Sequence, residues 1–136
     1  MSWEDYHRRA RVVDGVLHDV AASRNGQIPA QWWPEIRVVF GGDGGFAGAL
    51  YHRWFAALTA RLDAVLEEWP ADLPDAAAQA ARLLARERPA LFGLLSAYAS
   101  HPVLAAVRER EKEFLAWAPG AQLAALTAQP AAAPAA

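Results

Sequence analysis

Apolar side chains recur at alternating spacings of three and four along this chain, and no stretch shows the period of two that marks a half-buried strand. Such spacing places apolar residues on one face of a helix. A first stripe of this kind consists of Trp3, Tyr6, Ala10, Val13, Leu17 and Val20. A second and longer stripe consists of Tyr51, Phe55, Leu58, Leu62, Val65 and Trp69. The sequence therefore predicts an all-α fold.

Capping residues and glycines mark helix boundaries in the first third of the chain. Ser2 and Asp5 have the spacing of a capping box, in which each side chain accepts a hydrogen bond from the other residue's backbone amide. The first helix is expected to end at Asn25-Gly26, because glycine readily takes the left-handed conformation that stops a helix. A compact element then runs over residues 28–40, and Gly41-Gly42 ends it.

One aspartate and three prolines mark the later helix starts. Asp43 is expected to cap the longest helix, which continues to about Trp69. Pro74, Pro89 and Pro102 each suit the first turn of a further helix, because a residue at that position needs no amide hydrogen. These signals predict three helices after the longest one.

Length and composition agree with one folded domain and a tail. The chain has 136 residues, of which 54% are hydrophobic, and the large apolar side chains suffice for one core. We expect residues 1–119 to form a single compact bundle of five to six helices. Residues 120–136 contain little except Ala, Gln and Pro, so we expect a low-complexity, mostly disordered tail there.

Several classes of function are disfavoured by what the chain lacks. It has no cysteine, which excludes disulfides, thiolate metal sites and thiol nucleophiles. Its net charge is −2 and its basic residues form no block of the kind that binds nucleic acid. The acidic start is unlike a secretory signal, and no run of 18 apolar residues predicts a membrane span. The Ala-rich composition, with Arg far outnumbering Lys, is typical of a GC-rich bacterium, and we expect a cytoplasmic location.

Four polar patterns resemble functional motifs, and each has a simpler structural interpretation. Glu4 and His7 have the spacing of a di-iron ligand pair, but the second such pair is absent and a solvated first turn explains them. Asp14 and His18, one turn apart, match a carboxylate–imidazole pair or an ordinary helix-surface contact. The glycine-rich run 40–45 lacks the Gly-Lys-Ser/Thr of a phosphate loop and predicts a tight helix–helix turn. The alternating charges of residues 108–113 predict a solvated face.

A group of aromatic residues on the later helices is the main candidate for a binding site. Its members are Tyr51, Trp54, Phe55, Phe92 and Tyr98. Aromatic residues at helical spacing usually belong to the core. The alternatives are a pocket for a small apolar ligand and a surface for self-association.

Two short stretches carry a resemblance to a known family: residues 12–17 (VVDGVL) and residues 40–50 (FGGDGGFAGAL). They are similar to the first helix, and to the aromatic, turn and long helix, of tetracycline-repressor-type (TetR) transcription regulators. The continuation to about residue 107 resembles the ligand-binding and dimerising part of that family. However, residues 23–39 are fewer than the two intervening helices of the family need, and Asp43 stands where the family has Lys. The resemblance therefore implies the helical scaffold and leaves DNA binding doubtful.

We expect a non-catalytic regulatory or adaptor protein that acts through protein–protein contacts. Its partner would be a second copy, through exposed apolar surface of the later helices, or another protein. A small-molecule sensor with an aromatic pocket and a TetR-type DNA-binding regulator are the alternatives. The sequence indicates no catalytic residue, no cofactor and no metal, so an enzyme is not expected.

Overall fold

The computed structural model describes residues 2–115, with the side chains of residues 2–107, 109 and 110. Within this range the backbone forms six α-helices, one turn of 3-10 helix and no strand, which confirms the all-α bundle. The expected tail at 120–136 lies outside the described residues, as do most side chains of the charged run 108–113. The elements are α1 (Trp3–Ala22), η1 (Ala30–Trp32), α2 (Trp33–Phe40), α3 (Asp43–Glu67), α4 (Leu73–Glu87), α5 (Pro89–Ala97) and α6 (Pro102–Leu115).

The N-terminal boundaries of α1 and α4 follow side-chain capping chemistry, and that of α3 does not. The capping box at Ser2 and Asp5 is present, and the Asp72 carboxylate accepts the backbone amide hydrogen of Asp75 at the start of α4. The expectation that Asp43 caps α3 is wrong, because Gly42 occupies the cap position and Asp43 is the first helical residue. Gly42 has φ 141°, a conformation that aspartate rarely adopts.

Two helices end earlier than the sequence indicates. α1 ends at Ala22, and Gly26 takes its left-handed conformation (φ 66°) in the following loop instead of at the helix terminus. α3 ends at Glu67, and Trp69 lies in the turn beyond it with φ 49°. By contrast, α2 ends at Gly41 in the left-handed conformation. The tight helix–helix turn predicted for the glycine-rich run is thereby confirmed.

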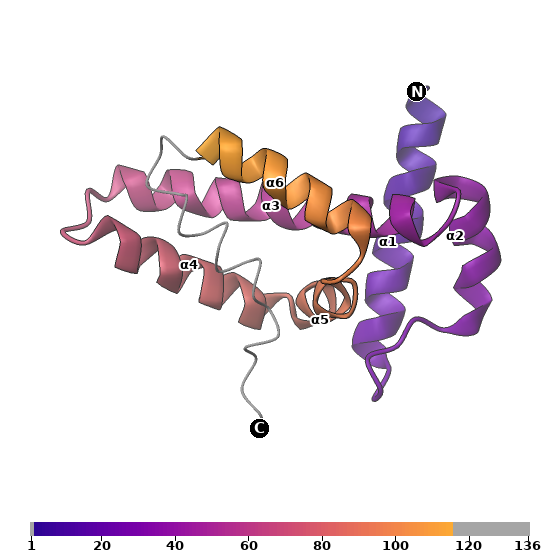
Figure 1. The fold of residues 1–136 in the computed structure, drawn as a ribbon. Helices are drawn as coiled ribbons and strands as arrows, with labels where there is room; N and C mark the ends of the chain where they lie inside the picture. Colours follow the sequence, from indigo (N-terminus) through magenta and orange to yellow (C-terminus); the bar gives the residue numbers. More distant parts are fainter. Residues whose placement is uncertain (1, 116–136) are drawn as a thin grey trace.

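α3 is the central element of the bundle and contacts α1, α2, α4, α5 and α6. As Figure 1 shows, α4 runs back beneath α3 and α6 lies along it, while α1 crosses the N-terminal end of α3 with α2 on its outer side. α5 lies between α4 and α1. The turn between α3 and α4 and the N-terminal end of α1 are therefore far apart in the molecule.

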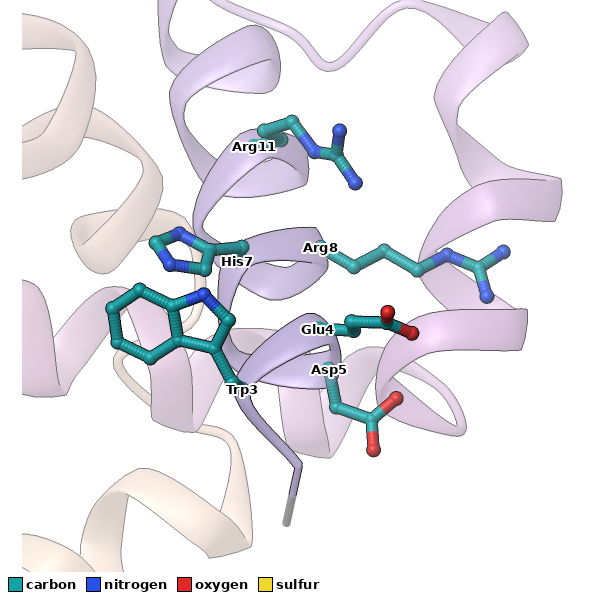
Figure 2. Close-up of a pocket in the computed structure, with 6 residues that line it drawn as sticks. All are labelled: Trp3, Glu4, Asp5, His7, Arg8 and Arg11. Atoms are coloured by element: carbon teal, nitrogen blue, oxygen red, sulfur yellow. The ribbon is translucent and has the colours of Figure 1, made fainter.

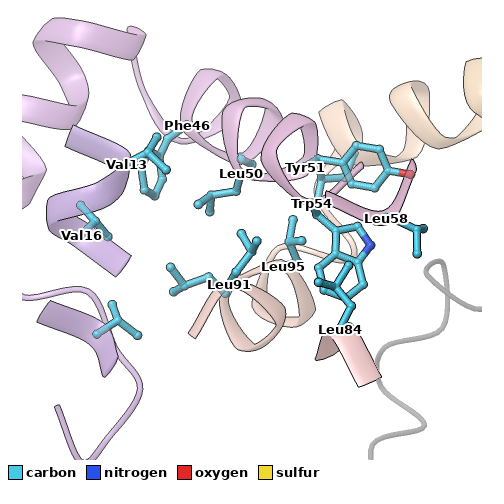
Figure 3. Close-up of a cluster of buried hydrophobic side chains, with 14 of the residues drawn as sticks. Val13, Val16, Phe46, Leu50, Tyr51, Trp54, Leu58, Leu84, Leu91 and Leu95 are labelled. Atoms are coloured by element: carbon cyan, nitrogen blue, oxygen red, sulfur yellow. The ribbon is translucent and has the colours of Figure 1, made fainter. Parts of the chain in front are cut away.

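One continuous apolar core connects these helices. Near α1 it contains Val13 and Val16, which face Phe46 and Leu50 of α3 (Figure 3). Further along α3, Trp54 and Leu58 lie close to Leu84 of α4 and Leu95 of α5. No polar or charged side chain among those described is buried, so the bundle is stabilised chiefly by apolar burial.

Two glycines permit close approach between elements. A Cβ atom at Gly15 of α1 would lie 2.5 Å from the ring of Trp32, whose indole N–H donates a hydrogen bond of 2.7 Å to Asp19. A Cβ atom at Gly45 of α3 would lie 2.2 Å from the carbonyl oxygen of Phe40 at the end of α2. Both distances are far below van der Waals contact. The close packing of η1 against α1 and of α2 against α3 therefore requires glycine, which has no side chain, at positions 15 and 45.

Candidate functional site

The five candidate aromatic residues are packed among the helices. Tyr51 and Trp54 are 4% and 2% exposed, while Phe55, Phe92 and Tyr98 are partly buried and pack against the core. The ring centroids of Trp54 and Phe92 are 5.7 Å apart, so the structure brings these two together. Tyr98 instead lies near His101, with ring centroids 6.3 Å apart. Residues of this group do not line the two surface hollows that are described below.

The polar pairs singled out in the sequence have other surroundings in the structure. Asp14 forms an ion pair with Arg53 of α3, and His18 is exposed. Glu4 and His7 are exposed on α1, where the ring of His7 contacts the ring of Trp3 edge-on at a centroid distance of 4.1 Å. Among the residues that the structure describes, no three His, Asp or Glu side chains are close enough to hold a metal ion.

The residues around Tyr98 form a small polar corner where α3, α5 and α6 meet. The imidazole Nδ1 of His101 accepts the backbone amide hydrogen of Val103 at 3.2 Å, at the start of α6. Burial, and secondly the negative charge of Asp43, raise the pKa of the Tyr98 phenol above its ordinary value of 10.0. At neutral pH Tyr98 is therefore uncharged, and the corner offers one carboxylate and one imidazole but no activated nucleophile.

Titration of the tyrosines tests this arrangement. In the folded chain the phenol of Tyr98 stays protonated to higher pH than in the unfolded chain, so its contribution to stability is present below pH 10 and is lost at higher pH. We expect Asp43→Asn to shift one component of the ultraviolet tyrosinate titration to lower pH, because a nearby negative charge is removed. Tyr98→Phe should remove that same component. A titration that Asp43→Asn leaves unchanged would show that the two groups do not interact.

The most exposed aromatic side chains lie outside the predicted candidate group. Trp3 and Tyr6 at the start of α1 are 75% and 60% exposed, and Trp69 after α3 is 90% exposed. Other helices therefore cover the apolar stripe of α1 in its later part, at Val13 and Val20, and leave Trp3 and Tyr6 exposed. A sequence signal for this was available, since residues 7–11 contain no apolar side chain larger than Ala.

Trp3, Tyr6 and His7 form one cluster of rings, which we call the N-terminal aromatic face. Tyr6 lies 5.7 Å from His7 and 6.5 Å from Trp3, measured between ring centroids. Figure 2 shows Trp3 and His7 on one side of α1, with Glu4 and Arg8 directed to the other side. These side chains border an open hollow of about 720 Å³, lined by Trp3, Glu4, Asp5, His7, Arg8 and Arg11.

A second, smaller hollow of about 250 Å³ lies between α1 and the corner joining α4 to α5. Leu17 and Ala21 form one wall, and residues 87–91 form the other. Apart from Glu87 and Arg88 its lining is apolar. The carboxylate of Glu87 is engaged in an ion pair with Arg61 of α3.

Comparisons with protein-family models, with curated proteins and with solved structures find no match to this chain. Over residues 2–115, no helix combines the length and the apolar character that crossing a membrane requires.

Proposed function

We propose that this chain is a non-catalytic regulatory or adaptor protein that acts through protein–protein contacts, including contacts with a second copy. The observation that carries the proposal is the N-terminal aromatic face. Trp and Tyr are the residues most enriched at the centres of protein interfaces, because each offers a large apolar area at low cost in side-chain entropy. Here two of them stand side by side in solvent, on a helix whose remaining apolar stripe is covered by the bundle.

The position of this surface differs from the one expected on the later helices. Leu66, Leu83 and Val103 are exposed there on three different helices, and Trp69 is exposed beyond the end of α3 without a second exposed ring beside it among the ring contacts of the described residues. Single exposed apolar side chains are normal on any soluble protein. Adjacent exposed aromatic rings are less common, and we therefore propose that the contact surface lies on α1.

The remaining candidate functions have less support from the described residues. The aromatic group proposed for ligand sensing packs in the core, with Trp54 against Phe92. Between α1 and α3 the chain forms one 3-10 turn and the eight-residue α2, where a TetR-type reader carries two helices. We retain that family resemblance as a proposal for the scaffold alone. Catalysis has the least support, because Asp14 pairs with Arg53 and not with His18.

Sedimentation velocity over a range of protein concentrations tests the proposed function. We expect the wild-type chain to self-associate and the Trp3→Ala/Tyr6→Ala variant to have a dissociation constant at least about tenfold higher, since aromatic interface centres commonly contribute that much or more. Both side chains are exposed, so the free energy of unfolding should change by less than about 0.5 kcal/mol each.

The matched control is Leu66→Ala/Trp69→Ala, which removes exposed apolar surface at the C-terminal end of α3, away from Trp3 and Tyr6 on α1. We expect it to associate like the wild type. A wild-type chain that stays monomeric at all concentrations would contradict self-association. Association that is lost in the control but retained in the Trp3→Ala/Tyr6→Ala variant would place the contact elsewhere.

A further inference from the structure

A histidine caps the first turn of α6. The helix begins at Pro102, so His101 occupies the cap position. Its Nδ1 atom accepts the backbone amide hydrogen of Val103 at 3.2 Å, and no carbonyl inside the helix can accept that hydrogen. The common capping residues are Ser, Thr, Asp and Asn, whose side-chain oxygens accept such a hydrogen bond at neutral and at mildly acidic pH. His101 differs from them because its acceptor atom can bind a proton.

The capping hydrogen bond exists only while the imidazole is neutral. A neutral imidazole has one nitrogen without a hydrogen, and only that nitrogen is an acceptor. In His101 this nitrogen is Nδ1, which places the ring hydrogen on Nε2. In the imidazolium both nitrogens are donors, so Nδ1 would direct a hydrogen at the amide hydrogen of Val103. Histidine is the side chain whose charge ordinarily changes between about pH 5 and pH 8.

The position of the ring adds a second effect of protonation. A Cβ atom at Gly44 would lie 3.3 Å from Cε1 of His101, so the ring lies against the first turn of α3. Figure 1 shows that α3 and α6 run in the same direction, which brings the N-terminal ends of both helices to this corner. No side chain caps α3. Because a helix N-terminus carries a partial positive charge, two such ends would repel an imidazolium here.

Two other titratable groups face this corner. Tyr98 of α5 lies edge-on to the imidazole of His101, with ring centroids 6.3 Å apart, and its phenol is uncharged at neutral pH because burial raises its pKa. Asp43, the first residue of α3, acts on the same corner through its negative charge. The first turn of α6 itself contains no acidic residue. Asp43 is therefore the group that would favour an imidazolium, against the lost hydrogen bond and the two helix ends.

The turn that His101 caps is anchored in the core. Leu104, which follows Val103, is 1% exposed and donates its backbone amide hydrogen to the carbonyl oxygen of His101 at 3.0 Å. A Cβ atom at Gly44 would also lie 3.1 Å from the side chain of Val103, so this turn packs directly on α3. Loss of the cap would therefore weaken the contact between α6 and α3 at a position where the core begins.

We propose that His101 is a pH-sensitive cap, which holds the start of α6 on α3 while its imidazole is neutral and releases it on mild acidification. The stabilisation that the cap gives is present at neutral pH and is lost as the pH falls, because only the neutral imidazole accepts the hydrogen bond. The device acts within one chain and does not depend on the self-association proposed above.

Replacement of His101 by asparagine separates the cap from its titration. Asparagine is a favoured capping residue without an ionisable group, so His101→Asn should hold α6 equally well at both ends of the range in which histidine titrates, about pH 7.5 and about pH 5. Between these two pH values the folding equilibrium constant of the wild type should fall about fivefold relative to that of the variant, which is the usual contribution of one cap. Urea unfolding at micromolar concentration measures both constants. His101→Ala should lack the cap at both pH values.

Hydrogen exchange at the Val103 amide gives the local measurement. We expect its protection, relative to an unstructured peptide at the same pH, to fall about fivefold on acidification of the wild type and to stay constant in His101→Asn. Asp43→Asn should make the wild-type response to acid larger, because it removes the carboxylate that favours the imidazolium.

His52→Gln is the matched control, because His52 is exposed on α3 away from this corner. It should keep the pH response of the wild type. The proposal would be overturned if the wild type and His101→Asn lost the same stability on acidification, or if the protection of the Val103 amide did not change with pH. A response that His52→Gln or Asp43→Asn abolished would likewise overturn it, since another group would then be titrating.

Discussion

Gly45→Ala is expected to lower the free energy of unfolding by about 2–3 kcal/mol, in the upper range for overpacking a tight site. The new Cβ atom would lie 2.2 Å from the Phe40 carbonyl oxygen, and a backbone atom cannot rotate away as a side chain can. The turn between α2 and α3 must open to admit the methyl group. Urea unfolding followed by circular dichroism measures the effect.

Gly93→Ala is the control for this substitution. Gly93 also lies inside a helix, α5, but nothing lies within 4 Å of the position that its Cβ atom would take. Alanine favours the helix over glycine, so stability should rise by about 0.5–1 kcal/mol. If Gly45→Ala were equally stabilising, the close approach of Phe40 to α3 would be refuted.

Trp54→Ala is expected to cost about 3–5 kcal/mol of unfolding free energy, the usual range for deleting a buried large aromatic side chain. Trp54 is 2% exposed and packs against Phe92 between α3 and α5. Since domains are stable by only about 5–15 kcal/mol, this single change would remove a large part of the total. Thermal and urea unfolding both report it.

Trp69→Ala removes the same atoms from a side chain that is 90% exposed. Its effect on the free energy of unfolding should stay within about 0.5 kcal/mol, as for other surface substitutions. Equal losses at the two positions would mean that the C-terminal end of α3 is covered in solution. The pair of variants thus also tests whether Trp69 is free.

Local signals in the sequence predicted the helices well. Prolines at 74, 89 and 102 stand within the first two residues of α4, α5 and α6, because their missing amide hydrogen is not needed there. The cap of α3 was predicted wrongly, since aspartate is the commoner capping residue in general. The conformation at Gly42 depends on how tightly α2 and α3 are joined, which is a property of the packed turn.

Burial along a helix was harder to predict than the helix itself. The stripe of α1 has the same spacing from Trp3 to Val20, yet its first two members are exposed and Val13 and Val20 are buried. Periodicity shows which face of a helix is apolar, but only the neighbouring helices determine how far along that face is covered. The N-terminal aromatic face is therefore evident in the structure and not in the spacing.

Partner choice among polar side chains is non-local for the same reason. The sequence places His18 one turn from Asp14, but the structure pairs Asp14 with Arg53, 39 residues away. Trp54 and Phe92 likewise come from different helices. Helical spacing places Tyr51 and Trp54 on the apolar side of α3, while the contact of Trp54 with Phe92 depends on the fold.

The length of α3 separates the start of α1 from the turn that joins α3 to α4. Its 25 residues extend for about 37 Å at 1.5 Å per residue. The turn between α3 and α4, in which Trp69 is 90% exposed, lies far from the N-terminal end of α1, where Trp3 is 75% exposed (Figure 1). A partner bound at the start of α1 would therefore leave the exposed side chain of Trp69 accessible beyond the far end of α3.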